Sequence, residues 1–587
     1  MHNVKKTPAS EAINAAYEAK RKAKLQQFLE TRELIFQKRS RGELDEEILR
    51  ITSEVLEKNP DIYTFWNIRR NALISIIQRA EDETDEDYEK RHNELMKNEL
   101  GLTRKALMAN PKSYSAWFQR FWVLEREISP DLKQELELCK TALAVDCRNF
   151  HCWDHRRLVV KLAEISAEDE LEFSNALIQS NPSNYSAWHY RGMLLMKTQP
   201  DVSGHGMVIS EDCLAGEFEK ILPICSYNAE DQTSWTYCRW LSESACPKEK
   251  NEPELLTASF VSPTDVLLVF SSPISKKEVS KLCPGLLDDS KIKAISFAKC
   301  LHDKYQKCNN WSLSLDPSQP SISIIVDKDK DFLLEYDSGK SFVNDYAIKK
   351  VYSTETRCKS PVAKEALEGL VRVCEELLNI DNDIPWTYAA LLRTIILLNG
   401  EKDDIITRGD ELVQKIKALD PQRENLYHEL WERVRFSAKL RDSSSDSSLL
   451  DNLLSGDRRL DLRSLSLTSV DHLKHLAGLI TDLDLQNNLI SDLKQFNVFP
   501  GLKSLVLNEN PIDKIEESVY LPNLKFLSLG RTNLKEASAV KTIRGSFPRI
   551  ERLLVCETGL IDQQEEVHAI LNPNDSNSKI RIFFYYM

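Results

Sequence analysis

The stretch NPKSYSAWFQR (110–120) decides the fold, because five other segments repeat its pattern of an Asn or Asp followed seven residues later by a Trp. These segments are NPDIYTFWNIRR (59–70), DCRNFHCWDHRR (146–157), NPSNYSAWHYRG (181–192), NAEDQTSWTYCR (228–239) and NIDNDIPWTYAA (379–390). The Trp residues are Trp66, Trp117, Trp153, Trp188, Trp235 and Trp386, and the first five are separated by 51, 36, 35 and 47 residues. A period of this length corresponds to one helical hairpin. The sequence therefore predicts a row of antiparallel α-hairpins.

The residue types within each copy predict separate roles. The Asn or Asp suits a helix cap, and the Pro that follows it in three copies suits the first helical turn. The aromatic residue three positions before the Trp shares a helix face with it, which predicts that Tyr63, Tyr114, Phe150 and Tyr185 lie in the core. The Arg three positions after the Trp is expected to pair with a carboxylate or carbonyl of a neighbouring repeat. These arginines are Arg69, Arg120, Arg156 and Arg191.

Two further patterns divide the chain into domains. Between the fifth and sixth copies, the runs LTASFVS, DVLLVF, WSLSL and SISIIV alternate with turn signals and predict an inserted immunoglobulin-like β-sandwich. After a Ser-rich linker, ITDLDLQNNLI (480–490) and LKSLVLNENPI (502–512) match the leucine-rich repeat, with Asn488 and Asn510 at its Asn position. The prediction is a multidomain, mainly α protein: a helical-repeat crescent at 1–243 and 347–441, a sandwich at 244–346, and a leucine-rich domain at 442–587.

Composition excludes several classes of function. The net charge of −13 over 587 residues argues against a general nucleic-acid binder, because phosphate affinity requires a basic surface. Thirteen scattered cysteines without a CxxC pair favour a reduced, cytoplasmic protein over a disulfide framework. No window reaches the roughly 18 apolar residues of a membrane span, and the basic N-terminal segment lacks the apolar core of a signal peptide.

Common catalytic motifs such as GxxxxGK[ST], GxSxG and HExxH are absent from the sequence. The best metal-like cluster is Cys147, His151, Cys152 and His155, in which the two histidines are spaced i, i+4 on one helix face. The cluster lies within the third repeat, whose Asp, Phe, Trp and Arg already account for this helix. Packing is therefore the favoured interpretation, and no metal site is predicted in this chain.

Lys112 is the residue of the opening stretch that the other copies do not keep. The position equivalent to Lys112 in the other copies holds Asp61, Arg148, Ser183, Glu230 and Asp381. Of these, Arg148 alone is also basic. Two residues past a helix cap, free N–H groups and the helix dipole favour an anion, and a lysine there could complete a phosphate site. From the residues alone, a solvated surface lysine is the stronger interpretation.

Repeats of the form N-P-x-x-Y-x-x-W-x-x-R resemble those of the protein prenyltransferase α subunit family, over the six copies between residues 59 and 390. With the inserted sandwich and leucine-rich tail, the chain resembles the α subunits of Rab geranylgeranyltransferases (type II). The resemblance implies a heterodimer whose β subunit holds zinc (Zn2+) and the lipid pocket. The dimer would transfer geranylgeranyl from geranylgeranyl diphosphate to C-terminal cysteines of Rab GTPases presented by Rab escort protein. The escort protein is expected to dock on the helical domain.

The resemblance also assigns site residues. Lys112 and Tyr114 would contact the diphosphate, and His151 would be its polar neighbour. Phe150 lacks the hydroxyl of the family's tyrosine, and Phe118 with Gln119 stands where relatives often carry His-His. The contacts that the family makes through those tyrosine and histidine side chains are therefore not expected in this chain. His2, near a basic N-terminus, is a weak candidate for reaching the β-subunit zinc, against the stronger interpretation of an ordinary exposed histidine.

The competing hypothesis is a non-enzymatic scaffold of the tetratricopeptide type with a leucine-rich tail. Tetratricopeptide repeats keep a stricter period of about 34 residues and place small residues at helix contacts, so the Trp-centred copies favour the prenyltransferase interpretation. Farnesyltransferase α subunits lack both the insert and the tail.

Overall fold

A computed structural model gives the structure in two compact units, Met1–Thr198 and Gln199–Met587, and each is described here by itself. The described residues are 8–79, 83–246, 253–283, 291–295, 307–315, 321–327, 330–336, 341–352, 358–399, 403–442, 447–573 and 579–584.

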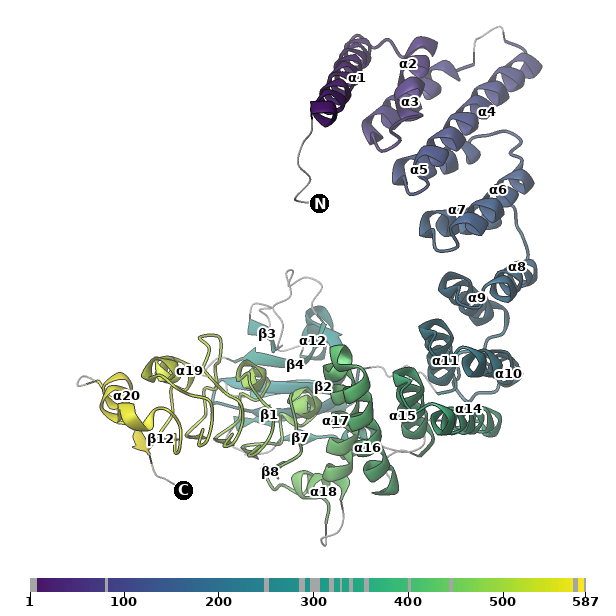
Figure 1. The fold of residues 1–587 in the computed structure, drawn as a ribbon. Coiled ribbons are helices and arrows are strands. Elements are labelled where there is room, and N and C mark those ends of the chain that lie inside the picture. The colour runs from purple at the N-terminus through teal and green to yellow at the C-terminus, as the bar shows by residue number, and fades with distance from the viewer. Residues whose placement is uncertain are drawn as a thin grey trace. The chain divides into compact units, whose positions relative to one another are not determined.

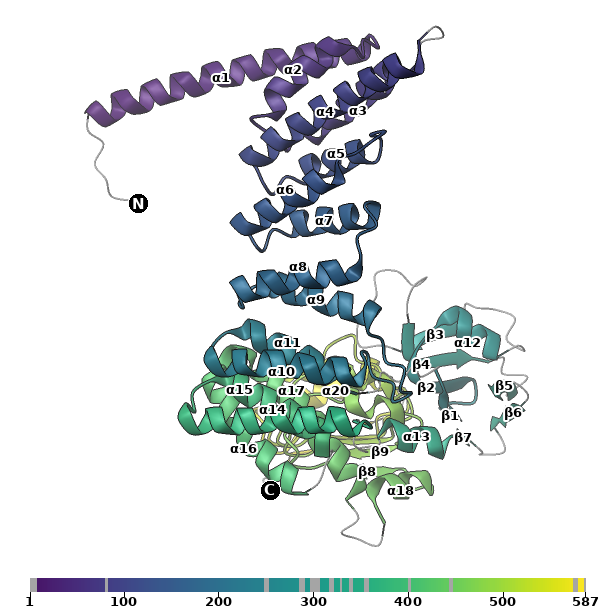
Figure 2. The ribbon, with the colours of Figure 1, turned by 90° about the vertical axis from the view of Figure 1, so that its right-hand side faces the viewer.

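The first unit is a stack of helical hairpins that follows a long helix, α1 (Pro8–Ser40) (Figure 1). Consecutive helices pair as α2 with α3, α4 with α5, α6 with α7 and α8 with α9, and the pairs lie side by side in chain order (Figure 2). Their bounds are α2 Glu46–Leu56, α3 Tyr63–Ile76, α4 Asp85–Ala109, α5 Tyr114–Leu124, α6 Leu132–Val145, α7 Phe150–Leu162, α8 Ala167–Ser180 and α9 Tyr185–Thr198. The predicted hairpins are confirmed for these four copies.

The caps differ from the prediction by three residues. Asn110 ends α4 as its C-cap, whereas the N-cap of α5 is Ser113, whose hydroxyl accepts from the Ala116 N–H at 3.3 Å. The Asn110 side chain accepts instead from the Lys112 N–H at 3.0 Å, which closes a tight turn. Lys112 therefore lies in the turn before α5 rather than in its first helical turn. Asn and Asp favour both kinds of position, so residue type alone did not distinguish them.

The spacing of seven residues between cap and Trp has a structural cause. The indole N–H of Trp117 donates to the Pro111 carbonyl, six residues earlier, at 2.8 Å. The same bond joins Trp66 to Pro60, Trp153 to Cys147, Trp188 to Pro182 and Trp235 to Ala229. All five indoles are buried. Each Trp thus fastens the turn to the helix that follows it, because a buried N–H must find an acceptor.

The sixth copy is shifted by two residues from the predicted alignment. Its first helix is α14 (Pro361–Ile380), which is capped by Asp381, and α15 (Pro385–Asn399) follows. Asp381 accepts from the Asp383 N–H at 3.0 Å, as Asn110 does from Lys112. Seven residues after this cap comes the buried Tyr388, while Trp386 is only half-buried. The assignment of Trp386 as the equivalent Trp is therefore wrong, because it was counted from Asn379, a residue inside α14.

Three of the four repeated arginines, Arg69, Arg120 and Arg156, pair with the next hairpin, as predicted. The Arg120 Nε lies 2.6 Å from Glu135 Oε1 on α6, and its Nη1 donates to the Leu100 carbonyl at 2.9 Å. Arg69 and Glu99 form the same pair one joint earlier, as do Arg156 and Glu170 one joint later. Arg191 is also buried. Because guanidinium and carboxylate are both desolvated, these pairs specify how neighbouring hairpins stack.

The glutamates of these pairs were not singled out in the sequence, although their spacing is regular. Glu99, Glu135, Glu170 and Glu217 each lie 18 residues before the Trp of their own copy. Each also binds the residue two positions after that Trp. Those residues are Gln119, His155, Tyr190 and Tyr237, at 2.6–2.9 Å. A search for carboxylates in phase with the Trp would have found them.

The second unit begins with the helical hairpin α10 (Glu211–Tyr227) and α11 (Gln232–Ser244) and continues, after an inserted sheet, with α14, α15, α16 (Asp403–Leu419) and α17 (Glu424–Arg441). The insert contains a five-stranded antiparallel sheet of order β3-β4-β2-β1-β7 and the hairpin β5-β6. The bounds are β1 Leu255–Phe260, β2 Asp265–Ser275, α12 Lys276–Leu282, β3 Ile292–Ile295, β4 Lys307–Ser314, β5 Ser321–Asp327, β6 Lys330–Glu335, β7 Phe342–Val343 and α13 Asp345–Val351. An antiparallel sheet region thus lies where the sequence predicts one.

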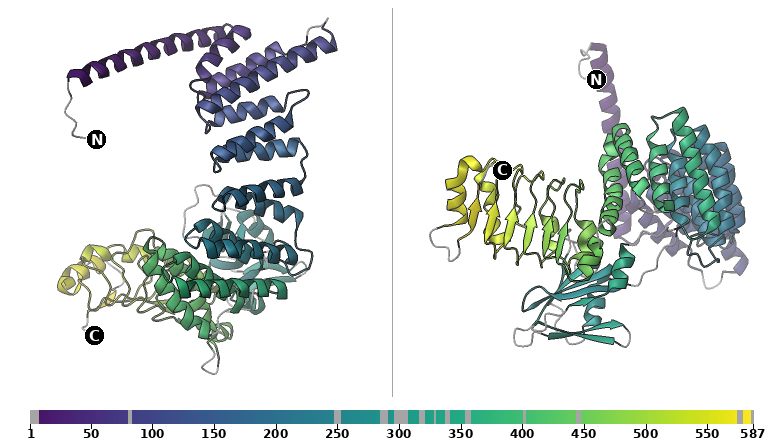
Figure 3. Two further views of the ribbon diagram at one scale, coloured as in Figure 1. Left: turned by 45° about the vertical axis from the view of Figure 1, so that its right-hand side comes forward. Right: turned by 90° about the horizontal axis from the view of Figure 1, so that it is seen from below.

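The C-terminal segment, which follows α18 (Leu449–Leu454), winds as a solenoid with one short strand per turn (Figure 3). This solenoid is called the parallel coil. The six strands pair in parallel and in chain order. In the coil, the Asn510 amide donates to Leu485 O and accepts from Ile490 N, each at 2.9 Å, and so joins consecutive turns. The remaining bounds are β8 Arg459–Asp461, β9 Asp482–Asp484, β10 Ser504–Val506, β11 Phe526–Ser528, α19 Ile543–Ser546, β12 Arg552–Leu554, α20 Gln564–Leu571 and β13 Arg581–Phe583.

The insert and the parallel coil share one core. Leu267 and Val269 of β2 belong to the same apolar cluster as Leu473 and Leu476 of the coil. The backbones approach so closely that a Cβ on Gly478 would lie 2.2 Å from the Thr257 hydroxyl. In the described part of the chain, no helix is both long enough and apolar enough to cross a membrane.

Candidate functional site

The structure brings Lys112, Tyr114 and His151 together at the joint between the second and third hairpins of the first unit. Lys112 lies in the turn before α5, Tyr114 is the first residue of α5, and His151 is the second residue of α7. The Tyr114 and His151 rings meet edge to face, with centroids 4.2 Å apart. The Phe150 ring lies against the other side of His151 at 3.9 Å. A cation, a phenol and an imidazole thus share one end of these two helices.

Lys112 keeps most of its side chain in solvent, with 69% of it exposed. Its Nζ lies 3.7 Å from Asp146 Oδ2, while the other oxygen of Asp146 accepts from the Arg148 N–H at 3.1 Å. An exposed pair at this separation is weak and is easily exchanged for another anion. The sequence marked Asp146 as a cap, but its contact with Lys112 depends on the stacking of two hairpins and was missed.

His151 is buried beside these exposed groups. Burial lowers the pKa of His151, the Asp154 carboxylate opposes this effect, and the Lys112 ammonium lowers the pKa further. The ordinary value is 6.5, so the imidazole is neutral at pH 7. A neutral imidazole beside Lys112 can form a hydrogen bond to an anion without adding a second charge.

The aromatic residues predicted to lie in the core are instead exposed. The first residues of α3, α5, α7 and α9 are Tyr63, Tyr114, Phe150 and Tyr185. The exposed fractions of these four residues range from 49% to 70%. Three residues turn a helix by about 300°, which leaves each ring about 60° away from the buried Trp. Phe118 is also exposed, at 59%, one turn after Tyr114. These five rings are called the aromatic strip. Large exposed apolar rings in series mark a surface that meets a partner.

The residues of the metal-like cluster in the third hairpin do not converge. The His155 Nε2 lies 2.6 Å from Glu135 Oε1 inside the hairpin stack, and the Cys152 thiol donates to the Cys139 carbonyl at 3.5 Å. Within the ranges that the structure describes, no three His, Cys, Asp or Glu side chains are placed to hold a metal ion. His2 lies outside the described residues.

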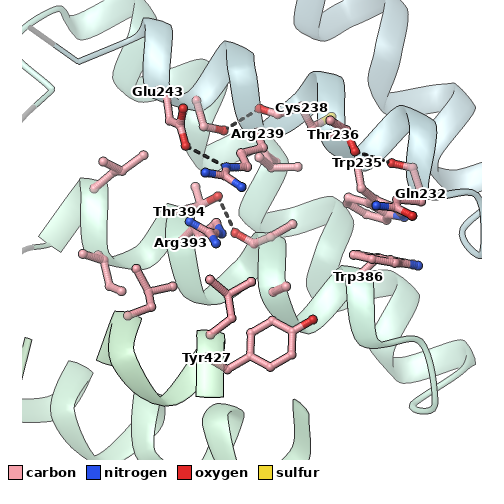
Figure 4. A pocket seen from close by; sticks show the side chains of 18 of the residues that line it. Gln232, Trp235, Thr236, Cys238, Arg239, Glu243, Trp386, Arg393, Thr394 and Tyr427 are labelled. Atoms are coloured by element: carbon pink, nitrogen blue, oxygen red, sulfur yellow. Dashed lines mark hydrogen bonds and ion pairs between the residues drawn. The ribbon is translucent and has the colours of Figure 1, made fainter. Parts of the chain in front are cut away.

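A second candidate site is a cavity of about 380 Å3 in the second unit, lined by residues of α11, α14, α15 and α17 (Figure 4). The repeated ion pair is replaced at this joint. Cys238 stands three residues after Trp235, where other copies have Arg, and Leu370 stands 18 residues before Tyr388, where they have Glu. Both Cys238 and Leu370 line the cavity, with Arg393 beside them. The cavity is therefore lined by apolar side chains together with Arg239, Arg393, Arg423 and Glu243, and its apolar part is suited to an apolar side chain of a partner.

Comparisons with known proteins agree with this architecture. Residues 96–127, 132–163 and 167–198 match the protein prenyltransferase alpha subunit repeat. The chain is 32% identical over 577 residues to the geranylgeranyl transferase type-2 subunit alpha of Sus scrofa, covering 94% of each chain. It is also 32% identical over 592 residues to the protein of that name from Homo sapiens, covering 97% of this chain and 98% of the relative. A chain of Candida albicans protein geranylgeranyltransferase-I complexed with GGPP superposes with a TM-score of 0.39 at 13% identity. The superposition covers 68% of this chain and 88% of that chain, and it is too weak to support the assignment. With the hairpins and their Trp-centred turns, these sequence matches show that the chain belongs to the geranylgeranyl transferase type-2 α subunits, within the protein prenyltransferase α subunit family.

Proposed function

We propose that this chain is one half of a cytoplasmic enzyme that transfers geranylgeranyl from geranylgeranyl diphosphate to C-terminal cysteines of Rab GTPases presented by Rab escort protein. The other half is a β subunit, without which the chain is inactive. The relatives over nearly the whole chain bear the name of a geranylgeranyl transferase subunit. The observation that carries the proposal is the placement of Lys112 in solvent beside the neutral His151 on the exposed edge of the hairpin stack.

The β subunit is proposed to cover the aromatic strip. Four successive hairpins each contribute at least one exposed ring to the aromatic strip, and Tyr114 of the strip lies two residues after Lys112. Burial of such rings is favourable by roughly 1.5–3 kcal/mol each when they become fully covered. On this proposal Lys112 lies at the edge of the shared interface, and water is excluded there only in the complex.

In the reaction, the bond between the lipid C1 and the diphosphate oxygen breaks while the acceptor sulfur bonds to C1, and negative charge grows on the diphosphate. The Lys112 ammonium stabilises that charge, and the Tyr114 hydroxyl and His151 imidazole lie within the same group to donate hydrogen bonds. Asp146 holds Lys112 only loosely at 3.7 Å, so the diphosphate can replace it. A positioned donor of this kind contributes about 10²–10³ in rate.

The acceptor cysteine must react as a thiolate. When bound in the β subunit, zinc supplies this chemistry by lowering the thiol pKa. Residues of this chain are proposed to act on the leaving group and not on the metal, because Cys152 and His155 of the metal-like cluster are held by contacts inside the hairpin stack.

The accessory domains are proposed to be an immunoglobulin-like sandwich and a leucine-rich repeat domain. The insert's sheet and hairpin with a common core support the first assignment. The regular strands of the parallel coil and its buried asparagines support the second. For Rab escort protein, the helical repeats are the proposed docking region, and the cavity beside Arg393 is the recess they offer.

The proposal is tested by co-expressing the chain with a candidate β subunit and measuring transfer to an escort-bound Rab. Lys112→Ala is expected to lower the transfer rate about 10²-fold with little change in thermal stability, because the side chain is exposed. Lys133→Ala, an exposed lysine of α6, is the matched control and should leave the rate unchanged. An unchanged rate in Lys112→Ala would reject the assigned role. A pair that does not co-purify, or that does not transfer, would reject the function and favour a scaffold.

A further inference from the structure

Two arginines in the first unit are held against aromatic rings of α5. The Arg70 guanidinium of α3 lies 5.0 Å from the centroid of the Phe118 ring, and Arg126 lies 4.3 Å from that of Trp122. The Arg70 Nη1 donates to Gln119 Oε1 at 2.7 Å, and the Arg126 Nη1 donates to the Trp122 carbonyl at 3.2 Å. Stacking and hydrogen bonding therefore fix the orientation of both guanidinium groups.

These arginines lack the counter-charge that the repeated arginines have. The buried carboxylate of Glu99, whose charge acts on Arg70, is already bound by Arg69 at 3.0 Å and by Gln119 at 2.9 Å. Among the described residues, Arg70 has no carboxylate within ion-pair distance, while Arg126 has only the half-exposed Glu125 at 3.9 Å.

The two groups also repel each other. Burial lowers the pKa of Arg70, Glu99 opposes this effect, and Arg126 lowers the pKa further. Arg70 is half-buried and Arg126 is exposed. A partly desolvated guanidinium that has no carboxylate partner and lies near a second cation is unfavourable unless an anion joins them. A stacked, oriented guanidinium fork fits a carboxylate with two parallel hydrogen bonds, a geometry that a mobile lysine cannot offer.

The surroundings indicate which anion this is. Phe118, on which Arg70 lies, is part of the aromatic strip, and Tyr114 lies one turn away on the same helix. A free phosphate could neutralise the arginines but could not cover the rings. A protein surface that carries a carboxylate among apolar groups satisfies both. Arg157 of α7, by contrast, already has Asp154 of its own helix as an ion-pair partner.

We propose that Arg70 and Arg126 form a carboxylate-binding site within the aromatic strip, and that an acidic side chain of the β subunit fills it. This inference rests on the proposed function, since it assigns a residue-level anchor to the surface that the β subunit covers. The site directs orientation as well as affinity, because a charged pair surrounded by apolar contacts fixes the register of an interface.

The test measures the Kd between the full-length chain and its β subunit at 50 and 200 mM NaCl. The double variant Arg70→Met with Arg126→Met is expected to bind at least tenfold more weakly and to depend less on salt, since interfacial charge pairs contribute at this scale. Arg50→Met is the control, because Arg50 is an exposed α2 residue paired with Glu54. It should bind as the wild type does.

A second variant covers the case in which the methionine protein does not fold. Arg70→Lys with Arg126→Lys retains the charges but not the fork, so it should keep the salt dependence and still bind several-fold more weakly. Wild-type affinity in either double variant would overturn the inference while leaving the proposed function intact. The inference would also be overturned if a double variant lost inorganic phosphate binding as the free chain while its affinity for the β subunit stayed unchanged. Absence of any binding between the wild-type chain and the β subunit would overturn both.

Discussion

Replacing Glu135 by Gln tests whether the buried ion pairs hold the hairpins together. Glu135 accepts hydrogen bonds from Arg120 of the preceding hairpin, the closest at 2.5 Å, and lies 2.6 Å from the His155 Nε2 of its own hairpin. Burial alone would raise the pKa of Glu135, but the hydrogen bonds from His155 and Arg120 outweigh it and lower the pKa from 4.5 to about 2. That difference corresponds to about 3 kcal/mol of stability. Gln keeps the shape of the side chain but removes its charge.

The expected loss is therefore about 3 kcal/mol, at the lower end of the cost of breaking a buried ion pair. For a unit of the size of Met1–Thr198, this lowers the midpoint of thermal unfolding by roughly 6–12 °C. Glu137→Gln is the matched control, because Glu137 is an exposed residue on the same helix and should change the midpoint very little.

The pH dependence gives an independent readout. Because the folded pKa lies below the unfolded value, the stabilisation is complete above pH 4.5 and is lost as the pH falls toward 2. The difference in unfolding free energy between wild type and Glu135→Gln should shrink over this range. A variant as stable as Glu137→Gln at pH 7, or a difference independent of pH, would refute the argument.

The other predictions concern the second unit. Asn510→Leu leaves the Ile490 N–H without its partner and removes one of the two side-chain amides that donate to the Leu485 carbonyl. It should lower the free energy of urea unfolding by about 1–3 kcal/mol, whereas an unchanged value would contradict the amide's role. Gly478→Val places a Cβ 2.2 Å from the Thr257 hydroxyl, so limited proteolysis should cleave the insert faster, while Gly545→Val, which has open space at its Cβ, should not. Burial, with Arg433 and Lys474 adding to it, lowers the pKa values of His472 and His475 to about 4. The unfolded chain therefore takes up protons first, and stability should fall as the pH drops from 6.5 to 4. The double variant with Gln at both positions should flatten this pH profile, and an equally steep profile would exclude the histidines.

The amino-acid sequence determined the helical hairpins and pointed to one joint between them. The period of the Trp predicted the hairpins, because a turn, a cap and a packed indole need fixed spacings along the chain. The deviation at Lys112 marked one joint among several, whereas Tyr114 and His151 were assigned by the resemblance to the prenyltransferase α subunits; the structure has both rings beside Lys112. Local spacing carries the hairpin pattern, since its turn, cap and indole lie within a few residues of a helix end.

The tertiary structure decided what depends on two hairpins meeting. A helix period does not say whether Tyr114 or Trp117 faces inward, because both lie near the boundary of the buried face; packing buried the indole and left the phenol in solvent. The contact of Asp146 with Lys112, and the pairing of Glu135 with Arg120, join residues of neighbouring copies. Such partners are chosen by the distance between helices in space, which repeat spacing alone does not set. Arg70 has no carboxylate within ion-pair distance in the described part of the chain, and Arg126 has only Glu125; both facts became visible for the same reason, since a missing partner is recognised only when the neighbours are in place.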